Sequence, residues 1–210
     1  MIDFYTSATP NGRKVAIMLE ETALPYRVHR IDLGAGDQHR PGFLKLNSNN
    51  KIPVIHDPDT GVTLAESSAI LIYLAEKTGQ FQPESLQDRY ETLQWVMFQM
   101  ASVGPMMGQL WWFRRSAPEE IPLAIDRYEA ETKRIFSVLD GRLAGRSGIA
   151  GDYGIADIAT WPWIDAHRPL GIDIAAYPNL ARWYAAVGAR PAVQRGMAVP
   201  AADAPRAFPA

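Results

Sequence analysis

Two runs of residues stand out in this chain, Asn49-Asn50-Lys51-Ile52-Pro53-Val54-Ile55 and Leu64-Ala65-Glu66-Ser67-Ser68-Ala69-Ile70-Leu71-Ile72-Tyr73. The apolar part of the first run predicts a strand that is entered through an X-Pro bond, where a cis peptide can be held. Residues 57–61 have the composition of a turn, and residues 62–64 predict a second strand. The two runs therefore predict a hairpin that leads into a helix starting near Glu66.

The helix start and the X-Pro bond together predict half of a peptide-binding site. A cis bond at Pro53 would leave the N–H and C=O of Ile52 directed outward, available to an extended ligand. Free backbone donors and the positive end of the helix dipole attract an anion. We therefore expect Ser67 to bind a carboxylate and Glu66 an ammonium group. The alternative is an ordinary helix start, with an acid near the dipole and a hydroxyl cap.

The composition limits the classes of partner. The chain has 210 residues, 47% of them apolar and 21% charged, and a net charge of −2. This composition is ordinary for a globular protein of one or two domains. The net charge provides no excess of positive charge that would attract nucleic acid or an anionic membrane. No apolar run approaches a membrane span and the first residues do not resemble a secretory signal, so we expect a cytoplasmic protein.

The chain contains no cysteine. Disulfides, thiolate metal sites and a cysteine nucleophile of the protein itself are therefore excluded. If thiol chemistry occurs, the thiol arrives with the ligand. The four histidines show none of the spacings of a metal site, so no metal is predicted.

The hydrophobic pattern divides the chain into two parts. Residues 2–5 and 26–31 alternate as strands around a helix at 13–22, and a short helix or turn at 41–46 precedes the hairpin. Residues 1–78 thus predict a βαβαββα domain. Residues 79–86, with Gly79 as a helix stop and Pro83 beyond it, are the expected linker, and residues 87–210 the expected all-helical domain.

Two long helices are predicted after the linker. The first carries apolar residues at helical spacing and bends near Gly104, and the second covers 121–143, so a short loop makes them an antiparallel pair. The first stripe contains Leu86, Tyr90, Leu93, Met97 and Met100. Trp95 and Phe98 lie away from it, which predicts a homodimer whose partner covers them. Residues 199–210, rich in Ala and Pro, are expected to be a loosely held tail.

Three motifs carry a family resemblance over nearly the whole chain. They are Thr9-Pro10-Asn11-Gly12, Asp32-Leu33-Gly34-Ala35-Gly36-Asp37-Gln38 and Asn49-Asn50-Lys51-Ile52-Pro53. Together they resemble the glutathione transferases, and among them the Nu-class-like bacterial enzymes that are also described as disulfide-bond oxidoreductases. The resemblance implies a thioredoxin-like glutathione-binding domain at residues 1–78, followed by the all-α C-terminal domain of that family.

The resemblance also implies the residues that stabilise the sulfur of glutathione. Free thiols titrate near 8.5, so donors must favour the thiolate at neutral pH. Thr9 and Asn11 match the family motif and are the expected catalytic residues. A helix cap for Thr9 and a turn role for Asn11 remain alternatives, as do Ser7 and Tyr5 as the sulfur donors.

Further binding residues follow from the same resemblance. Gln38 matches a ligand-binding position of the family. Gln38 and Lys51 flank the site and could reach the second carboxylate of the ligand, with a simply solvated side chain as the alternative for Lys51. Arg127 precedes a matching Tyr-Glu pair and is expected to contact an anionic ligand, in its own subunit or in the neighbouring one, or else to be solvated beside Glu131. Residues 111–113 are expected either to wall an electrophile pocket or to pack in the core.

The predicted function is therefore glutathione-dependent transfer or disulfide reduction. The ligand set is Asn11, Gln38, Lys51, Ile52, Pro53, Glu66, Ser67 and Arg127, with glutathione, in its reduced or oxidised form, as co-substrate. The resemblance implies that two glutathiones, or the oxidised dimer, can be held together. A non-catalytic binding or assembly module with the same fold is the alternative, and peroxide reduction would use the same residues.

Gly154 stands where the family usually has a Ser or Thr helix cap, with Asp157 three residues later.

Overall fold

The computed structural model describes residues 1–208, which form two compact units. One unit consists of Met1–Gln80 together with the segment from residue 190 on, and the other is Phe81–Ala189. The sequence analysis predicted that residues 87–210 form the helical domain. The structure instead groups α9 (Pro191–Met197) with the N-terminal unit, because α9 packs along α1 (Pro10–Glu21).

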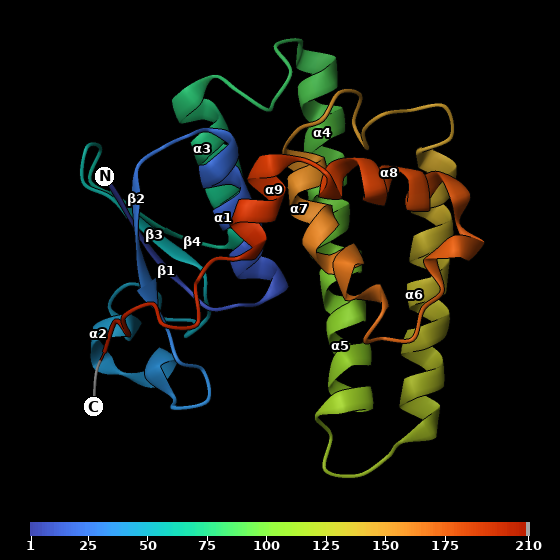
Figure 1. Cartoon of the computed structure of the whole chain (residues 1–210), viewed down its shortest axis with the longest axis horizontal. Coiled ribbons are helices and arrows are strands. Elements are labelled where there is room, and N and C mark those ends of the chain that lie inside the picture. The colour runs from blue at the N-terminus through green and yellow to red at the C-terminus, as the bar shows by residue number, and fades with distance from the viewer. Residues whose placement is uncertain (209–210) are drawn as a thin grey trace. The chain divides into compact units, whose positions relative to one another are not determined.

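The N-terminal unit is built on a four-stranded mixed sheet (Figure 1). Its strands are β1 (Ile2–Thr6), β2 (Tyr26–Arg30), β3 (Val54–Asp57) and β4 (Val62–Ala65), in the order β2-β1-β3-β4. β1 and β2 are parallel, whereas β3 pairs antiparallel with both β1 and β4. The helices are α1, α2 (Pro41–Leu44), α3 (Ser67–Thr78) and α9, with a 3₁₀ turn η1 (Asp37–His39). The predicted βαβαββα fold is confirmed.

Helix α1 begins three residues earlier than the periodicity predicted. Pro10 occupies its first position, where a missing N–H costs nothing, and the Thr9 Oγ1 caps the helix by accepting the Gly12 N–H at 3.3 Å. A Cβ on Gly12 would lie 2.4 Å from the Ser7 carbonyl oxygen. Glycine is therefore what lets the first turn of α1 approach the loop that follows β1.

The C-terminal tail is held firmly, which corrects the expectation of a loose segment. The Ala207 N–H donates to the Arg30 carbonyl at 2.8 Å, beside the outer strand β2. The Arg206 guanidinium donates to both oxygens of the fully buried Asp37 carboxylate, at 2.8 and 3.3 Å, and these hydrogen bonds lower the pKa of Asp37. Phe208 packs beside a core cluster around Ile31. Residues 209–210 lie outside the described part of the chain.

The second unit is a helical bundle (Figure 1). Its helices are α4 (Leu86–Phe98), α5 (Gly104–Arg115), α6 (Pro122–Arg142), α7 (Ile155–Ile164) and α8 (Pro178–Gly188), with short turns η3 (Asp165–His167) and η4 (Ile174–Ala176). A π-helical turn, η2 (Gln99–Val103), joins α4 to α5 at the predicted bend. α5 and α6 form the expected antiparallel pair. No helix within residues 1–208 is both long and apolar enough to cross a membrane.

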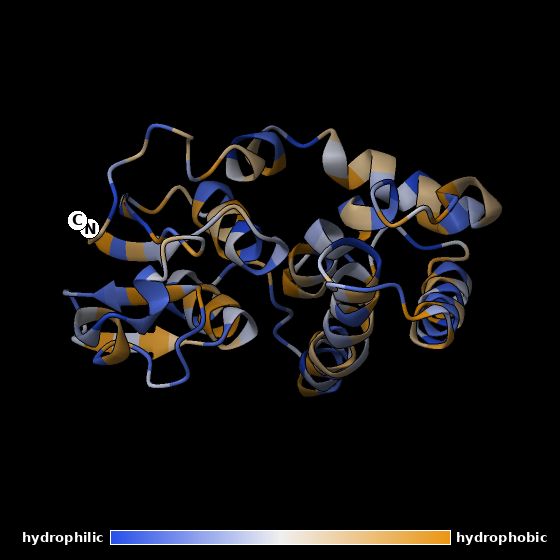
Figure 2. Ribbon diagram, turned by 90° about the horizontal axis from the view of Figure 1, so that it is seen from below, coloured by the Kyte–Doolittle hydropathy of each residue, from blue (hydrophilic) through white to orange (hydrophobic). Residues whose placement is uncertain are grey.

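The apolar stripe predicted for α4 does not face the core. Leu86 is 71% exposed, Tyr90 65% and Met97 48%, while Thr92, Val96 and Gln99 are buried. Trp95 is partly covered, since the Arg142 guanidinium lies 5.1 Å from its ring centre. In Figure 2 the long helices carry both apolar and polar residues around their circumference. Periodicity predicted the helix correctly but assigned the wrong face to the interior.

The start of α7 explains why Gly154 replaces the usual hydroxyl cap. A Cβ at this position would lie 2.7 Å from the Phe81 carbonyl oxygen, and that carbonyl accepts the Ile155 N–H at 3.0 Å. The Asp157 carboxylate completes the cap by accepting the N–H groups of Gly154 and Ile149 at 3.0 Å and the Trp183 indole N–H at 2.7 Å. Burial nevertheless raises the pKa of Asp157 to about 6.

Replacing Asp157 with asparagine should lower the free energy of unfolding by about 2 kcal/mol, because one of the buried N–H donors loses its acceptor. Urea unfolding followed by circular dichroism measures the change. Asp152→Asn, an exposed acid in the same loop, is the matched control and should stay within about 0.5 kcal/mol of wild type. Equal losses for the two variants would contradict the role given to Asp157.

Candidate functional site

A cavity with a volume of about 140 Å³ in the N-terminal unit brings together most of the predicted ligand residues. It is lined by Asn11, Asn47, Lys51, Ile52, Pro53, Glu66 and Ser67. These residues come from the first turn of α1, the loop before β3 and the start of α3. Segments that are 55 residues apart in the sequence therefore meet at one small, polar site.

The loop before β3 presents main-chain groups at the cavity. The Ile52–Pro53 peptide is cis, as the sequence suggested, although β3 itself starts only at Val54. Within residues 1–208, neither the N–H nor the C=O of Ile52 takes part in a backbone hydrogen bond, while the Ile52 side chain packs on the Ile31 cluster. The backbone polar groups of Ile52 are therefore not used in backbone hydrogen bonds here, and their role in binding an extended ligand stays a prediction.

Asn47 organises this loop and was missed by the sequence analysis. Its Nδ2 donates to the Lys51 carbonyl at 2.8 Å, and its Oδ1 accepts the Asn49 N–H at 3.0 Å. An asparagine in this loop was a usable sequence signal, because asparagine side chains commonly close such turns by hydrogen bonding to nearby backbone groups. Lys51 itself is exposed at the rim.

The start of α3 has an unusual backbone. Glu66 precedes the helix with φ 66° and ψ 110°, a conformation that side chains with a Cβ seldom adopt. Its carboxylate is exposed, whereas Ser67 is only 2% exposed and its Oγ lies 3.2 Å from the Lys14 Nζ. Such strain tends to occur where a site requires a particular geometry.

The first turn of α1 holds both predicted sulfur donors. Asn11 lines the cavity, and Thr9 caps the helix without lining it. Because Thr9 uses an acceptor position of its oxygen for the cap, its hydroxyl hydrogen can still be donated. The cap interpretation and the donor interpretation of Thr9 are therefore compatible.

The alternative sulfur donors lie elsewhere in the unit. Tyr5 stacks on His29, with ring centres 4.5 Å apart, and burial raises the pKa of its phenol. Ser7 lines a different cavity, with a volume of about 270 Å³, beside residues 31–34. Neither side chain belongs to the set that lines the Asn11 cavity.

Two further predicted residues do not line the cavity. Gln38 sits in η1, where its Nε2 lies 3.4 Å from the Leu33 carbonyl oxygen. Arg127 belongs to the helical unit and is exposed on α6. The Arg134 side chain hydrogen bonds to Glu131 and lowers its pKa, and the charge of Arg127 adds to this effect. A ligand role for either residue stays a prediction.

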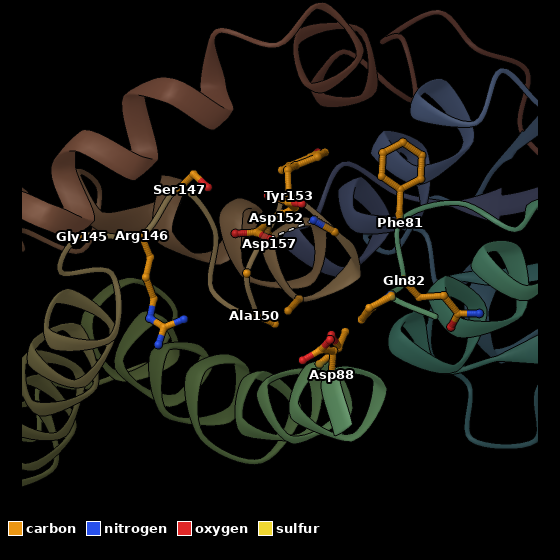
Figure 3. Close-up of a pocket in the computed structure, with 15 residues that line it drawn as sticks. Phe81, Gln82, Asp88, Gly145, Arg146, Ser147, Ala150, Asp152, Tyr153 and Asp157 are labelled. Atoms are coloured by element: carbon orange, nitrogen blue, oxygen red, sulfur yellow. Dashed lines mark hydrogen bonds between the residues drawn. The ribbon is translucent and has the colours of Figure 1, made fainter. Parts of the chain in front are cut away.

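A larger cavity, with a volume of about 640 Å³, lies within the helical unit (Figure 3). It opens between the start of α4, the segment 81–83 and the loop 145–154, and its lining includes Asp88, Arg146 and Asp152. None of the predicted ligand residues lines it. Since the lining charges are mostly paired or solvent-exposed, size alone does not make this cavity the functional site.

Comparison with known proteins covers both units of the chain. A model of the glutathione S-transferase N-terminal domain matches residues 8–77, and one of the C-terminal domain matches residues 104–191. The chain is 46% identical over 203 residues to the disulfide-bond oxidoreductase YfcG of Escherichia coli K12, covering 94% of each chain. This chain belongs to the glutathione S-transferase family. It is also 39% identical to YghU of the same organism over 97% of this chain and 76% of YghU.

Solved structures of this glutathione S-transferase family share the fold and contain glutathione. A glutathione transferase from Burkholderia graminis, with two glutathione molecules per subunit, is 49% identical with a TM-score of 0.88, covering 96% of this chain and 89% of that one. Another from Pseudomonas putida, with one glutathione disulfide per subunit, is 43% identical with a TM-score of 0.88, covering 95% and 91%. The resemblance inferred from the three motifs is confirmed at the level of the family.

Changing Glu66 to glycine should raise the free energy of unfolding by about 1 kcal/mol, because relief of the backbone strain exceeds the entropy cost of glycine. Urea denaturation measures the gain. Glu76→Gly, an exposed position inside α3, is the control and should lose about 1 kcal/mol. A loss of stability in Glu66→Gly would mean that Glu66 is not strained.

Proposed function

We propose that this protein is a glutathione-dependent disulfide-bond oxidoreductase that also has the chemistry for glutathione transfer. The observation that carries the proposal is the cavity lined by Asn11, Ile52 and Ser67. It combines an amide near the expected sulfur, free main chain for an extended peptide and a helix start for a carboxylate. These are the three requirements for holding a peptide thiol.

Glutathione would bind in an extended conformation along Ile52. Its γ-glutamyl carboxylate would meet the Ser67 hydroxyl and the N–H groups of the first turn of α3, with the Glu66 carboxylate near its ammonium group. The sulfur would lie near Thr9 and Asn11, at the start of α1. Gln38, Lys51 and Arg127 remain the candidates for contacts with the rest of the ligand.

The chemistry requires a thiolate, and this chain has no cysteine to provide one. The glutathione thiolate attacks one sulfur of a substrate disulfide, forming a mixed disulfide as the original S–S bond breaks and releases the other sulfur as a thiolate. A second glutathione thiolate then attacks the mixed disulfide, which yields glutathione disulfide and the second substrate thiol. Both electrons come from the two glutathiones, so the protein itself undergoes no redox change.

Two kinds of relative support this assignment. The name of the Escherichia coli relative at 46% identity is that of a disulfide-bond oxidoreductase, and the Burkholderia graminis structure holds two glutathiones per subunit. We propose that this chain likewise accommodates two glutathiones or the oxidised dimer, and that it belongs with the Nu-class-like enzymes. Peroxide reduction would use the same thiolate. A cytoplasmic location stays a prediction.

The competing proposal is a binding or assembly module that holds glutathione without turnover. Ser67 and the main chain of Ile52 would be needed by both, whereas only an enzyme needs donors at the sulfur. Retention on immobilised glutathione together with reduction of a model disulfide supports the enzyme. Retention without reduction supports the module.

Asn11→Ala should raise the pKa of the bound glutathione thiol by about one unit and lower the rate of disulfide reduction at neutral pH about tenfold. The physical reason is the loss of one hydrogen bond to a charged sulfur. The ultraviolet absorbance of the thiolate as a function of pH measures the first effect, and steady-state kinetics measure the second. Thr9→Val tests the hydroxyl in the same assays.

Asn49→Ala is the control for these variants, because Asn49 is exposed in the neighbouring loop and does not line the cavity. It should leave both measurements at the wild-type values. An unchanged thiol pKa in both Asn11→Ala and Thr9→Val would reject these residues as the sulfur donors.

We also propose that the chain forms a homodimer, but through a different surface from the one the sequence suggested. Leu86, Tyr90 and Met97 form an exposed apolar row along α4, whereas Trp95 and Phe98 are partly buried. A symmetric partner would remove this row from water. Light scattering should therefore give the mass of two chains.

The double variant Tyr90→Asp, Met97→Asp should give the mass of one chain, because charges would be buried at the interface. Leu123→Asp, on α6 and 82% exposed, is the control and should remain a dimer. A wild-type monomer, or a double variant that remains a dimer, would exclude an interface at this row.

A further inference from the structure

Lys14 is a fully buried lysine beneath the cavity. It lies on α1, has no exposed surface, and its Nζ is 3.2 Å from the Ser67 Oγ on α3. Lysine is rarely buried completely, because removing the ammonium group from water is costly. Burial lowers the pKa of Lys14 to about 7, and the negative charge of Glu66 opposes this shift.

The direction of the contact follows from the chemistry of the two groups. An ammonium group has three donors and no acceptor, so the Ser67 oxygen must accept the hydrogen bond. The hydroxyl hydrogen of Ser67 then points away from Lys14. Because Ser67 lines the cavity, that hydrogen can be donated to an anion there.

We propose that Lys14 is a positioning residue that orients the Ser67 hydroxyl as a donor to the carboxylate of the ligand and places a positive charge behind it. The proposal rests on the proposed function, since it assigns the anion subsite of the same cavity. Lys14 does not touch the ligand itself. It acts on the ligand by orienting the Ser67 hydroxyl and, at longer range, through its positive charge.

The surrounding charges support a role in anion binding. Glu66, at the start of α3, is the carboxylate whose charge acts on Lys14, and it also lines the cavity. On the α9 side of α1, the two arginines are engaged further along the helix, where Arg190 bonds to Glu21 and Arg195 to Glu20. The charge of Lys14 therefore offsets the repulsion that Glu66 would exert on a bound carboxylate.

This arrangement couples binding to a proton. A bound anion stabilises the ammonium form of Lys14 and raises its pKa, so binding takes up a proton once Lys14 is partly neutral in the free protein. Neutral Lys14 has a lone pair that can accept the Ser67 hydrogen and withdraw it from the ligand. Affinity for the anion should therefore fall as the pH rises through about 7.

The test is titration calorimetry with S-methylglutathione, which has no ionisable thiol, between about pH 6 and pH 8. Wild type should bind more weakly as the pH rises and should take up protons on binding near pH 8. Lys14→Met should bind about tenfold more weakly at pH 6, lose the pH dependence, and raise KM for glutathione with kcat changed less than about twofold. Lys45→Met, an exposed lysine, is the matched control and should resemble wild type.

Two further variants keep the test decisive if Lys14→Met folds poorly. Lys14→Gln keeps a neutral donor to Ser67 and should bind with intermediate affinity but without the pH dependence. Ser67→Ala should weaken binding, and adding Lys14→Gln to it should cause a smaller loss than Lys14→Gln causes alone, because the orienting part of its effect needs the Ser67 hydroxyl. Circular dichroism and a thermal melt verify that each variant is folded.

The outcomes distinguish this proposal from the one on which it depends. Wild type that fails to bind S-methylglutathione would overturn the proposed function. Wild type that binds, with Lys14 variants of equal affinity or unchanged pH dependence, would overturn only the role of Lys14. Additive losses in the Ser67→Ala pair would also overturn it, since they would show that Lys14 acts independently of Ser67.

Discussion

The packing of α1 against α3 is the contact on which the site depends. Both helices begin at the cavity, and each contributes a polar residue from its first turn, Asn11 from α1 and Ser67 from α3. Gly12 allows the start of α1 to approach the preceding loop, and the buried Lys14 joins the two helices through Ser67. A sideways shift of either helix would separate the groups that must contact one ligand. The arrangement is thus fixed by main chain and buried side chains instead of by flexible surface residues.

The sequence was sufficient to predict the N-terminal fold and much of the cavity, because the signals there are local. Alternating apolar residues, turn residues and an X-Pro bond determine β3, β4 and the start of α3 within 25 residues. The contribution of Asn11 depended on the family resemblance, since Asn-Gly alone is equally typical of a turn. Lys14 was missed because its importance appears only when α1 and α3 come together, whereas Asn47 was missed although its local turn signal was present.

The failures have physical causes as well. Helical periodicity identifies the apolar row of α4 but does not say whether a neighbouring helix or another chain covers it, and Leu86 and Tyr90 are exposed within this chain. An Ala- and Pro-rich composition indicates weak secondary structure, yet Arg206 attaches the tail through an ion pair with the buried Asp37, and Phe208 through apolar packing. Contacts made by single residues with distant segments have no periodic signature. For the same reason the sequence did not indicate that the segment from residue 190 packs with the N-terminal unit.

The position of α9 and the tail has a consequence for how the chain is made. Ribosomes synthesise proteins from the amino end, so β1, α1 and β2 emerge before the helical unit, while the segments that cover α1 and the outer edge of β2 emerge only after it. An uncovered strand edge is a template for pairing with other chains. The N-terminal unit is therefore complete only after the whole helical unit has been made, and the outer edge of β2 stays uncovered on the nascent chain until the segment after residue 190 has been translated.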